Sequence, residues 1–134
     1  MKNRIFSGAA SEEFAGYAKA VIDGQMIYVS GTMGQDPDTA TMPESAIAQA
    51  KNALNEIAAT LAKAGASLAD VVVCRVFIAD AAYLRDVASV LGDYFRDIRP
   101  TNTLLISQFA TLGAKVEIEV TASRSNKSSQ ETSA

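Results

Sequence analysis

The chain has 134 residues, of which 49% are apolar and 20% are charged, and its net charge is −3. This size and composition are those of one globular domain, long enough to bury a core without disulfides or metals. The sequence has no histidine, which removes imidazole-based triads and histidine metal ligands, so we expect no metal site and no cofactor. The acidic balance and the lack of a basic stripe do not favour nucleic-acid binding.

Neither a membrane span nor a secretion signal is predicted. The apolar runs are far shorter than the about 18–20 residues that cross a bilayer, and no apolar region follows the basic start at 1–6. Cys74 is the only cysteine, so an intramolecular disulfide is excluded. Because Cys74 lies in an apolar run, we interpret it as a packed, inert thiol rather than a nucleophile. These features predict a cytoplasmic protein.

Two short strands are predicted near the N-terminus. Residues 7–15 have the composition of a loop or short turn. Strands are predicted at 17–21 and 26–30, separated by an Asp-Gly hairpin signal. Residues 31–41 are rich in Gly, Asp, Thr and Pro, so we expect a loop there.

A long amphipathic helix is predicted from residue 43 to residue 64. Pro43 suits the first helical turn, and Gly65 is a good C-terminal stop. Apolar residues recur at three- and four-residue steps, as one face of a helix requires. The stripe consists of Ile47, Ala50, Leu54, Ile57 and Leu61.

A strand and a second helix follow. The β-rich run at 71–79 predicts the strand, and Asp80 can cap a helix over about 81–97 that ends before Pro100. The apolar stripe of this helix consists of Leu84, Val87, Leu91 and Phe95. The pattern predicts that both helices cross over between strands of one sheet.

The last two strands are predicted at 103–109 and 115–122, joined around a glycine. Residues 1–123 therefore form one α+β domain with a mixed sheet and two helices. The polar segment at 124–134 is predicted to be a disordered tail.

Two of the predicted strands each have one wholly apolar face and one mixed face. In the strand at 115–122 the apolar face carries Val116, Ile118, Val120 and Ala122, and the mixed face carries Lys115, Glu117, Glu119 and Thr121. In the strand at 71–79 the apolar face carries Val72, Cys74, Val76 and Ile78, and the mixed face carries Val71, Val73, Arg75 and Phe77. The apolar faces fit burial under helices. The mixed faces are either the solvated side of a two-layer domain or, because three of the residues are large and apolar, a contact with another subunit.

Five segments between about residues 14 and 123 resemble the RidA/YjgF family, in unbroken order. They are 15–21, 28–32, 61–72, 76–80 and 115–120. The resemblance implies a chorismate-mutase-like fold, β-β-β-α-β-α-β-β, with a mixed six-stranded sheet and two helices on one face. It also implies a homotrimer built around a barrel of sheets, with a ligand cleft at each subunit boundary. The active members of the family hydrolyse enamines and imines to ketoacids and ammonia.

The family's signature arginine, two residues after the proline that precedes the fifth strand, corresponds to Asn102 here. In the family this arginine pairs with the substrate carboxylate, a contact worth roughly 1.5–3 kcal/mol. Asparagine has no charge, so either the substrate is not the usual amino-acid-derived imine or another cation replaces the arginine. Lys19 is the preferred candidate, because strand alternation places it on the same face as Tyr17. Arg99 is a weaker candidate.

Glu117 occupies the position of the family's water-positioning glutamate. Apolar walls and the like charge of Glu119 are expected to raise its pKa, as a group that accepts and returns protons requires. The alternative is a rim ion pair of Glu117 with Lys115 or Arg75. We expect Arg75 to pair with Glu117 or Glu119.

Tyr17 and the turn at Ser30 and Gly31 correspond to ligand-contacting positions of the family. For Tyr17 the resemblance implies a hydroxyl that holds the substrate, and the alternative is plain interface packing. For Ser30 and Gly31 the alternative is a tight loop without a binding role.

These residues predict an enamine or imine hydrolase that acts on a small reactive metabolite between subunits. The alternative, favoured by the neutral Asn102, is a non-catalytic trimer of the same fold that binds a small ligand or has a regulatory role. A ribonuclease, an activity sometimes attached to the family by name, is disfavoured because the chain has no histidine and no aromatic–basic stripe. The expected partners are a small molecule and further copies of the chain in a homotrimer, with no nucleic acid and no membrane.

Overall fold

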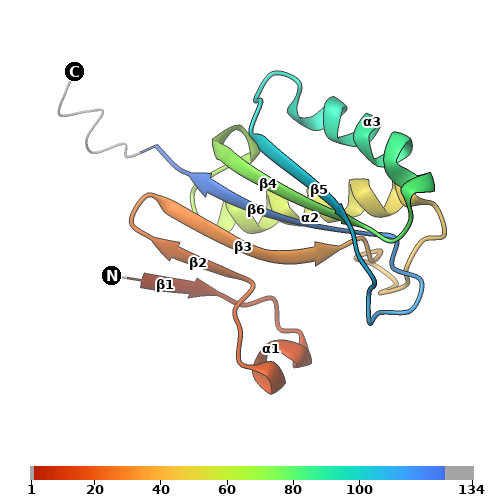
Figure 1. Cartoon of the computed structure of the whole chain (residues 1–134). Helices are drawn as coiled ribbons and strands as arrows, with labels where there is room; N and C mark the ends of the chain where they lie inside the picture. The colour runs from red at the N-terminus through yellow and green to blue at the C-terminus, as the bar shows by residue number, and fades with distance from the viewer. Residues whose placement is uncertain (1, 126–134) are drawn as a thin grey trace.

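The computed structural model of the chain describes residues 2–125 (Figure 1). Of the predicted disordered tail, 126–134 lie outside the described residues. Arg124 does not fit that prediction, because its backbone N–H donates to Gln25 and its guanidinium donates to the carbonyls of Ala64 and Gly24. These bonds fasten the end of the last strand to both the hairpin and the long helix.

A mixed six-stranded sheet forms one layer, with the order β1-β2-β3-β6-β4-β5. The strands are β1 (Lys2–Ile5), β2 (Ala20–Asp23), β3 (Met26–Met33), β4 (Val71–Ile78), β5 (Thr101–Ile106) and β6 (Val116–Ser123). All neighbours are antiparallel except β4 and β5, which are parallel. The last strand therefore lies at the centre of the sheet, between β3 and β4. This architecture confirms the predicted α+β fold class.

Two helices form the second layer, on one face of the sheet (Figure 1). Helix α2 (Ala46–Lys63) packs against β3 and β6, and α3 (Leu84–Phe95) packs beside α2. Short helical segments occur at α1 (Ala10–Ala15), η1 (Leu68–Asp70) and η2 (Ala81–Tyr83). The opposite face of the sheet carries no helix in the described part of the chain.

The apolar stripes of both helices are largely confirmed, with a shift at each start. Helix α2 begins after Ser45, whose hydroxyl accepts a hydrogen bond from the backbone of Ala48 and so caps the helix, and not at Pro43. Ile47 therefore lies in the first turn and is exposed. In α3 the buried residues are Val87, Val90 and Phe95, whereas Leu84 of the predicted stripe is 46% exposed.

The N-terminal part differs most from the prediction. The segment predicted as a loop at 7–15 contains α1, and the strand predicted at 17–21 begins only at Ala20. Strand β3 continues to Met33, into the predicted loop, and β1 was not predicted at all. The reason is that β1 is a short edge strand whose polar residues are exposed, so it has no apolar periodicity to detect.

A bulge in β4 overturns the predicted face of Val71. Val71 pairs with Ala122 and Val73 with Thr121, so two residues of β4 oppose one step of β6. The extra residue reverses the alternation N-terminal to it, so Val71 is 3% exposed in the core and Val72 is 42% exposed on the open face. From Val73 onward the predicted faces are confirmed.

Gln49 fastens three segments around the start of α2. Its side chain is fully buried; the amide N–H₂ donates to the carbonyls of Pro43 and Gly113, and the amide oxygen accepts from the backbone N–H of Lys115. A Cβ at Gly34 would lie 2.1–2.5 Å from the backbone of Gln49, so only glycine allows the end of β3 to approach the helix this closely. The start of β6 is thereby held in register with both β3 and α2.

Candidate functional site

Glu117 lies near the start of β6 on the face of the sheet that the helices leave uncovered. It pairs with Phe77 of β4 and with Met33 of β3, so its side chain stands over the centre of the sheet. Its carboxyl group rests on Gly31: a Cβ built there would lie 2.9 Å from Glu117 Cδ and 3.1 Å from Oε2. Because Gly31 has no side chain, the carboxyl group of Glu117 can lie directly against its α-carbon.

A β-bulge positions this seat. The register of β3 against β6 shifts between Val29 and Thr32, so Ser30 and Gly31 lie outside the regular ladder. The hydroxyl of Ser30 donates a hydrogen bond of 2.7 Å to the carbonyl of Ala18, in the segment that precedes β2. The bulge therefore has a fixed shape, and it presents backbone rather than a side chain to Glu117.

The surroundings of Glu117 raise its pKa. Partial burial disfavours the charged carboxylate most, the negative charge of Glu119 acts in the same direction, and the charge of Lys19 opposes both. The two predicted causes, apolar walls and the neighbouring Glu119, are therefore confirmed. A carboxyl group with a raised pKa is suited to accept and return a proton near neutral pH.

Arg75 pairs with Glu119 and not with Glu117. Its Nη1 lies 3.1 Å from Glu119 Oε1, across the β4–β6 ladder. The sequence analysis allowed either Glu117 or Glu119 as the partner of Arg75, and this contact identifies Glu119. It leaves the Glu117 carboxyl group without an ion-pair partner among the described residues.

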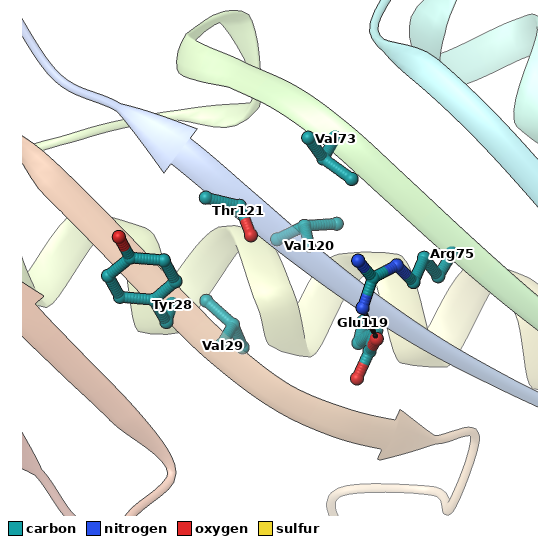
Figure 2. Close-up of a pocket in the computed structure, with 7 residues that line it drawn as sticks. All are labelled: Tyr28, Val29, Val73, Arg75, Glu119, Val120 and Thr121. Atoms are coloured by element: carbon teal, nitrogen blue, oxygen red, sulfur yellow. Dashed lines mark hydrogen bonds and ion pairs between the residues drawn. The ribbon is translucent and has the colours of Figure 1, made fainter.

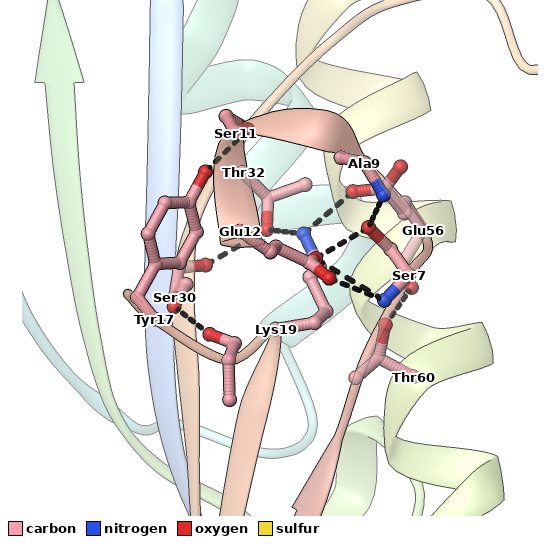
Figure 3. Close-up of polar contacts among 11 residues, drawn as sticks. Ser7, Ala9, Ser11, Glu12, Tyr17, Lys19, Ser30, Thr32, Glu56 and Thr60 are labelled. Atoms are coloured by element: carbon pink, nitrogen blue, oxygen red, sulfur yellow. Dashed lines mark hydrogen bonds and ion pairs between the residues drawn. The ribbon is translucent and has the colours of Figure 1, made fainter. Parts of the chain in front are cut away.

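Lys19 is placed differently from the prediction. It precedes β2, is 8% exposed, and its Nζ lies 2.6 Å from Glu56 Oε2 on α2 and 2.6 Å from Thr32 Oγ1 (Figure 3). Tyr17, by contrast, is 44% exposed. The two residues do not share a strand face, because the chain between them is not yet a strand. The substrate-binding role of Lys19 stays a prediction.

Tyr17 is anchored to α1, a helix that the sequence pattern did not reveal. Its hydroxyl group lies 2.7 Å from the Ser11 hydroxyl (Figure 3). At the start of α1, the buried Glu12 accepts hydrogen bonds from the backbone and hydroxyl of Ser7, and this hydroxyl bond lowers the pKa of Glu12. The polar cluster of Glu12, Lys19 and Glu56 thus fixes the segment that carries Tyr17.

Asn102 lies on the opposite side of the sheet from Glu117. It pairs with Cys74, and paired residues of parallel strands share a face, which here is the helix-covered one. There Asn102 lines a cavity of about 360 Å³ between α3 and β5, together with Arg99. Within one chain, therefore, the sheet separates Asn102 from Glu117.

The uncovered face of the sheet is apolar at its centre. Tyr28, Val72 and Leu105 are 46%, 42% and 54% exposed on β3, β4 and β5. A hollow of about 160 Å³ lies on this face. Figure 2 shows residues that line it, with the Arg75–Glu119 pair between β4 and β6 and with Tyr28 and Val73 on the strands to either side. We call this surface the open face. It consists of Tyr28, Val72, Val73, Phe77 and Leu105. Exposed apolar area of this extent is typical of an interaction surface.

Residues 2–125 contain no group of three or more Cys, Asp and Glu side chains that could hold a metal ion. None of the helices over the same residues is long and apolar enough to cross a membrane.

A six-stranded mixed sheet with two helices on one face and an acid over a glycine bulge is a chorismate-mutase-like α+β arrangement. The sequence model described as Endoribonuclease L-PSP matches residues 8–124. The 2-iminobutanoate/2-iminopropanoate deaminase of Capra hircus is 33% identical over 121 residues, which cover 89% of this chain and 88% of that protein. Protein DfrA of Myxococcus xanthus is 32% identical over 124 residues, which cover 90% of this chain and 95% of that protein.

A solved structure shows the same fold. A member of the YjgF/YER057c/UK114 family from Mycobacterium tuberculosis matches with a TM-score of 0.84 and 33% identity, covering 92% of this chain and 99% of that one. The chain belongs to the RidA/YjgF family, as the sequence segments predicted.

Sequence reasoning missed the supporting residues Glu12, Thr32 and Glu56. Each lies on a different element, and only the folded chain brings them to Lys19. No pattern in the sequence marks Glu56, because it is one of the exposed polar residues of α2, with 55% of its side chain accessible.

Proposed function

We propose that the chain hydrolyses small enamines and imines to carbonyl compounds and ammonia, in clefts between copies of itself. The observation that carries the proposal is Glu117, a half-buried carboxyl group with a raised pKa, seated on Gly31 beside an exposed apolar surface. The name of the Capra hircus relative, a 2-iminobutanoate/2-iminopropanoate deaminase, supports the same class of reaction.

The reaction needs one group that moves protons. A water oxygen bonds to the imine carbon while its proton passes to Glu117 and on to the imine nitrogen, which gives a carbinolamine. The hydroxyl proton then takes the same route to the amino nitrogen as the C–N bond breaks. A carbonyl compound and ammonia leave, and Glu117 returns to its starting state. Tyr17, Ser30 and Gly31 hold the substrate beside this carboxyl group.

The cleft requires more than one copy of the chain. Because the sheet separates Glu117 from Asn102, one ligand meets both residues only if they come from different copies. The open face supplies the apolar contact that brings the copies together, with the Arg75–Glu119 pair inside it. We propose the homotrimer that the family resemblance implies, with Glu117 from one copy and Asn102 from its neighbour in each cleft.

The experiment measures ammonia released from imines that an amino-acid oxidase generates in the assay. The panel covers small, branched, aromatic and acidic amino acids. The wild-type chain is expected to accelerate release from at least one imine, and Glu117→Gln is expected to lower that rate by about 10²- to 10⁴-fold. Asp86→Asn, which removes an exposed carboxylate on α3, in the helix layer across the sheet from Glu117 and outside the lining of the Asn102 cavity, serves as the control and should keep the rate. Release no faster than in buffer across the whole panel would contradict the proposal.

The second candidate function is a non-catalytic trimer that binds a small ligand. The observation that favours it is the neutral amide of Asn102 in the cavity, which offers hydrogen bonds without a charge. A chain without ammonia release that still melts at a higher temperature with a ketoacid would support this function.

A further inference from the structure

Lys19 brings a charge into the interior of the chain. The residue is 8% exposed, and its ammonium group lies between β3 and α2, 2.6 Å from Oε2 of Glu56 (Figure 3). Its partner is in contact with water, since 55% of the Glu56 side chain is accessible. Removing an ammonium group from water is costly, and a half-exposed carboxylate compensates only part of that cost. The ion pair is therefore weak evidence that this charge serves stability.

The second contact of the ammonium group begins a chain of hydrogen bonds. Lys19 Nζ donates to Thr32 Oγ1 at 2.6 Å, and the same hydroxyl group donates to the carbonyl oxygen of Ser30 at 2.9 Å (Figure 3). Thr32 is 1% exposed, so water does not compete for its hydroxyl group. Because an ammonium group can only donate, the single hydroxyl proton has to point to Ser30. A charged donor also strengthens the bond that the hydroxyl group makes next.

The chain of hydrogen bonds ends at the bulge on which Glu117 lies. The carbonyl of Ser30 belongs to the peptide group that joins Ser30 to Gly31, and the Glu117 carboxyl group lies against Gly31. Since a peptide group is planar, holding its carbonyl oxygen also holds the nitrogen of Gly31. The backbone of Lys19 adds a second hold, because its carbonyl accepts the N–H of Ser30 at 2.8 Å. Lys19 therefore holds Ser30 on both sides, once directly and once through Thr32.

The charge of Lys19 also acts on Glu117. Among the described residues, two charges shift the pKa of this carboxyl group: Glu119, two residues further along β6, raises it, and Lys19 lowers it. The cross-strand neighbours of Glu117, Met33 and Phe77, carry no charge. A change at Lys19 should therefore appear in the titration of Glu117. A residue that only packs the segment before β2 against α2 would leave that titration unchanged.

We propose that Lys19 is a positioning residue: acting through Thr32, it fixes the bulge on which the Glu117 carboxyl group lies. This role differs from the substrate contact predicted from the sequence, since the ammonium group acts from the helix-covered side of the sheet, where it contacts α2. The inference rests on the proposed function for its effect on the reaction. For its effect on the bulge and on Glu117 it rests on the hydrogen bonds and the charge alone.

The first test measures the bulge and the acid without any reaction. NMR titration of the carboxyl carbon gives the pKa of Glu117, and amide hydrogen exchange of Ser30, compared with the N–H groups of α2, gives the opening of the bulge. Lys19→Met keeps the apolar stem, and it should raise the pKa of Glu117 and speed exchange at Ser30 about tenfold. Thr32→Val breaks only the link and should speed this exchange to a similar extent. Lys51→Met, which removes an exposed lysine from α2, is the matched control and should change neither quantity.

The second test is a double-mutant cycle on kcat for ammonia release, at a pH above the acid limb of the pH–rate profile. Lys19→Met and Thr32→Val are each expected to lower kcat about tenfold, through misplacement of Glu117. The double variant should also lose about tenfold, because both changes break one chain of hydrogen bonds. In Lys19→Met the acid limb should move to higher pH, since the charge that lowers the pKa of Glu117 is gone. Losses that multiply to about 100-fold would overturn the action through Thr32.

The outcomes separate this inference from the proposed function. If ammonia release depends on Glu117 but Lys19→Met keeps the rate and the acid limb of the wild type, the inference is overturned and the hydrolase stands. If Lys19→Met raises the pKa of Glu117 and speeds exchange at Ser30 but no imine releases ammonia, the inference stands and the hydrolase is contradicted. A lower melting temperature as the sole effect of Lys19→Met indicates a merely structural ion pair and also overturns the inference.

Discussion

The carboxyl group of Glu117 is seated on the α-carbon of Gly31, with only 2.9 Å between Glu117 Cδ and the position that a Cβ would take. The contact joins the start of the central strand to a bulge in its neighbour. It places an acid with a raised pKa against backbone rather than beside another side chain. The position of the acid therefore depends on a residue that contributes no functional group.

Gly31→Ala is expected to displace the Glu117 carboxyl group and to lower imine hydrolysis by at least about tenfold, since misplacement of a reacting group by about 1 Å can cost about 100-fold. The backbone of Gly31 is not in the left-handed region, so stability should change little. Ammonia release and thermal melting of the same preparation provide the measurement. A rate equal to that of the wild type, with melting also unchanged, would show that the contact is irrelevant to catalysis.

The raised pKa of Glu117 predicts a specific change of stability with pH. The folded chain holds this proton more tightly than the unfolded chain, whose Glu117 titrates near the ordinary value of 4.5. The stabilisation is full below that value and is lost as the pH rises through the raised pKa. The free energy of unfolding of the wild type relative to Glu117→Gln should therefore fall across this range. Urea denaturation at a series of pH values measures it, and a constant difference would contradict the prediction.

The Arg75–Glu119 pair is expected to tune the proton affinity of Glu117. Glu119→Gln removes the negative charge that raises the pKa of Glu117, so the acid limb of the pH–rate profile should move to lower pH. Arg75→Met leaves Glu119 without its cation and should move the limb to higher pH. Shifts in the same direction for both variants would rule out this coupling.

Tyr28→Asp is expected to convert an oligomer into single chains. The substitution places a charge at the centre of the open face, where Tyr28 is 46% exposed, and a charge desolvated in an interface without a partner is strongly unfavourable. Light scattering should give the mass of three chains for the wild type and of one for the variant. Ile47→Asp, at a similarly exposed apolar residue on α2, is the control and should keep the larger mass. A wild type that already has the mass of one chain would end the proposal of inter-subunit clefts.

Cys74 is expected to be inert in the native chain. It is 1% exposed, and burial raises the pKa of its thiol to about 12, so almost no thiolate is available to react. A thiol reagent such as DTNB should label the chain only after denaturation in urea. Since Cys74 is the only cysteine, rapid labelling of the folded protein would contradict the prediction without ambiguity.

The parts of the fold that follow a long periodic pattern were predictable. The stripe of α2 from Ala50 onward, the alternation of β6 and the strand face of Glu117 all rest on repeats longer than six residues, and all three hold in the structure. The faces of Val71 and Val72 were not predictable, because a bulge changes the register without changing the composition. Helix α1 was missed because six residues, half of them polar, are too few to form a periodic apolar stripe.

The candidate site was only partly visible in the sequence. The effect of Glu119 on the pKa of Glu117 could be predicted, because side chains two residues apart on a strand lie on the same face. The ion pair of Lys19 with Glu56 could not, because it joins residues 37 positions apart through the packing of α2 on the sheet.

Gln49 has a consequence for how this chain tolerates mutation. Its amide gives two hydrogen bonds to carbonyl groups and accepts one from an N–H, a set that only a carboxamide satisfies. The near-isosteric Gln49→Glu would turn both donors into repulsive contacts, and Gln49→Leu would strand all three backbone groups without partners. Since Lys115 is two residues before Glu117, loss of this buried amide should displace the carboxyl group that the proposed reaction needs.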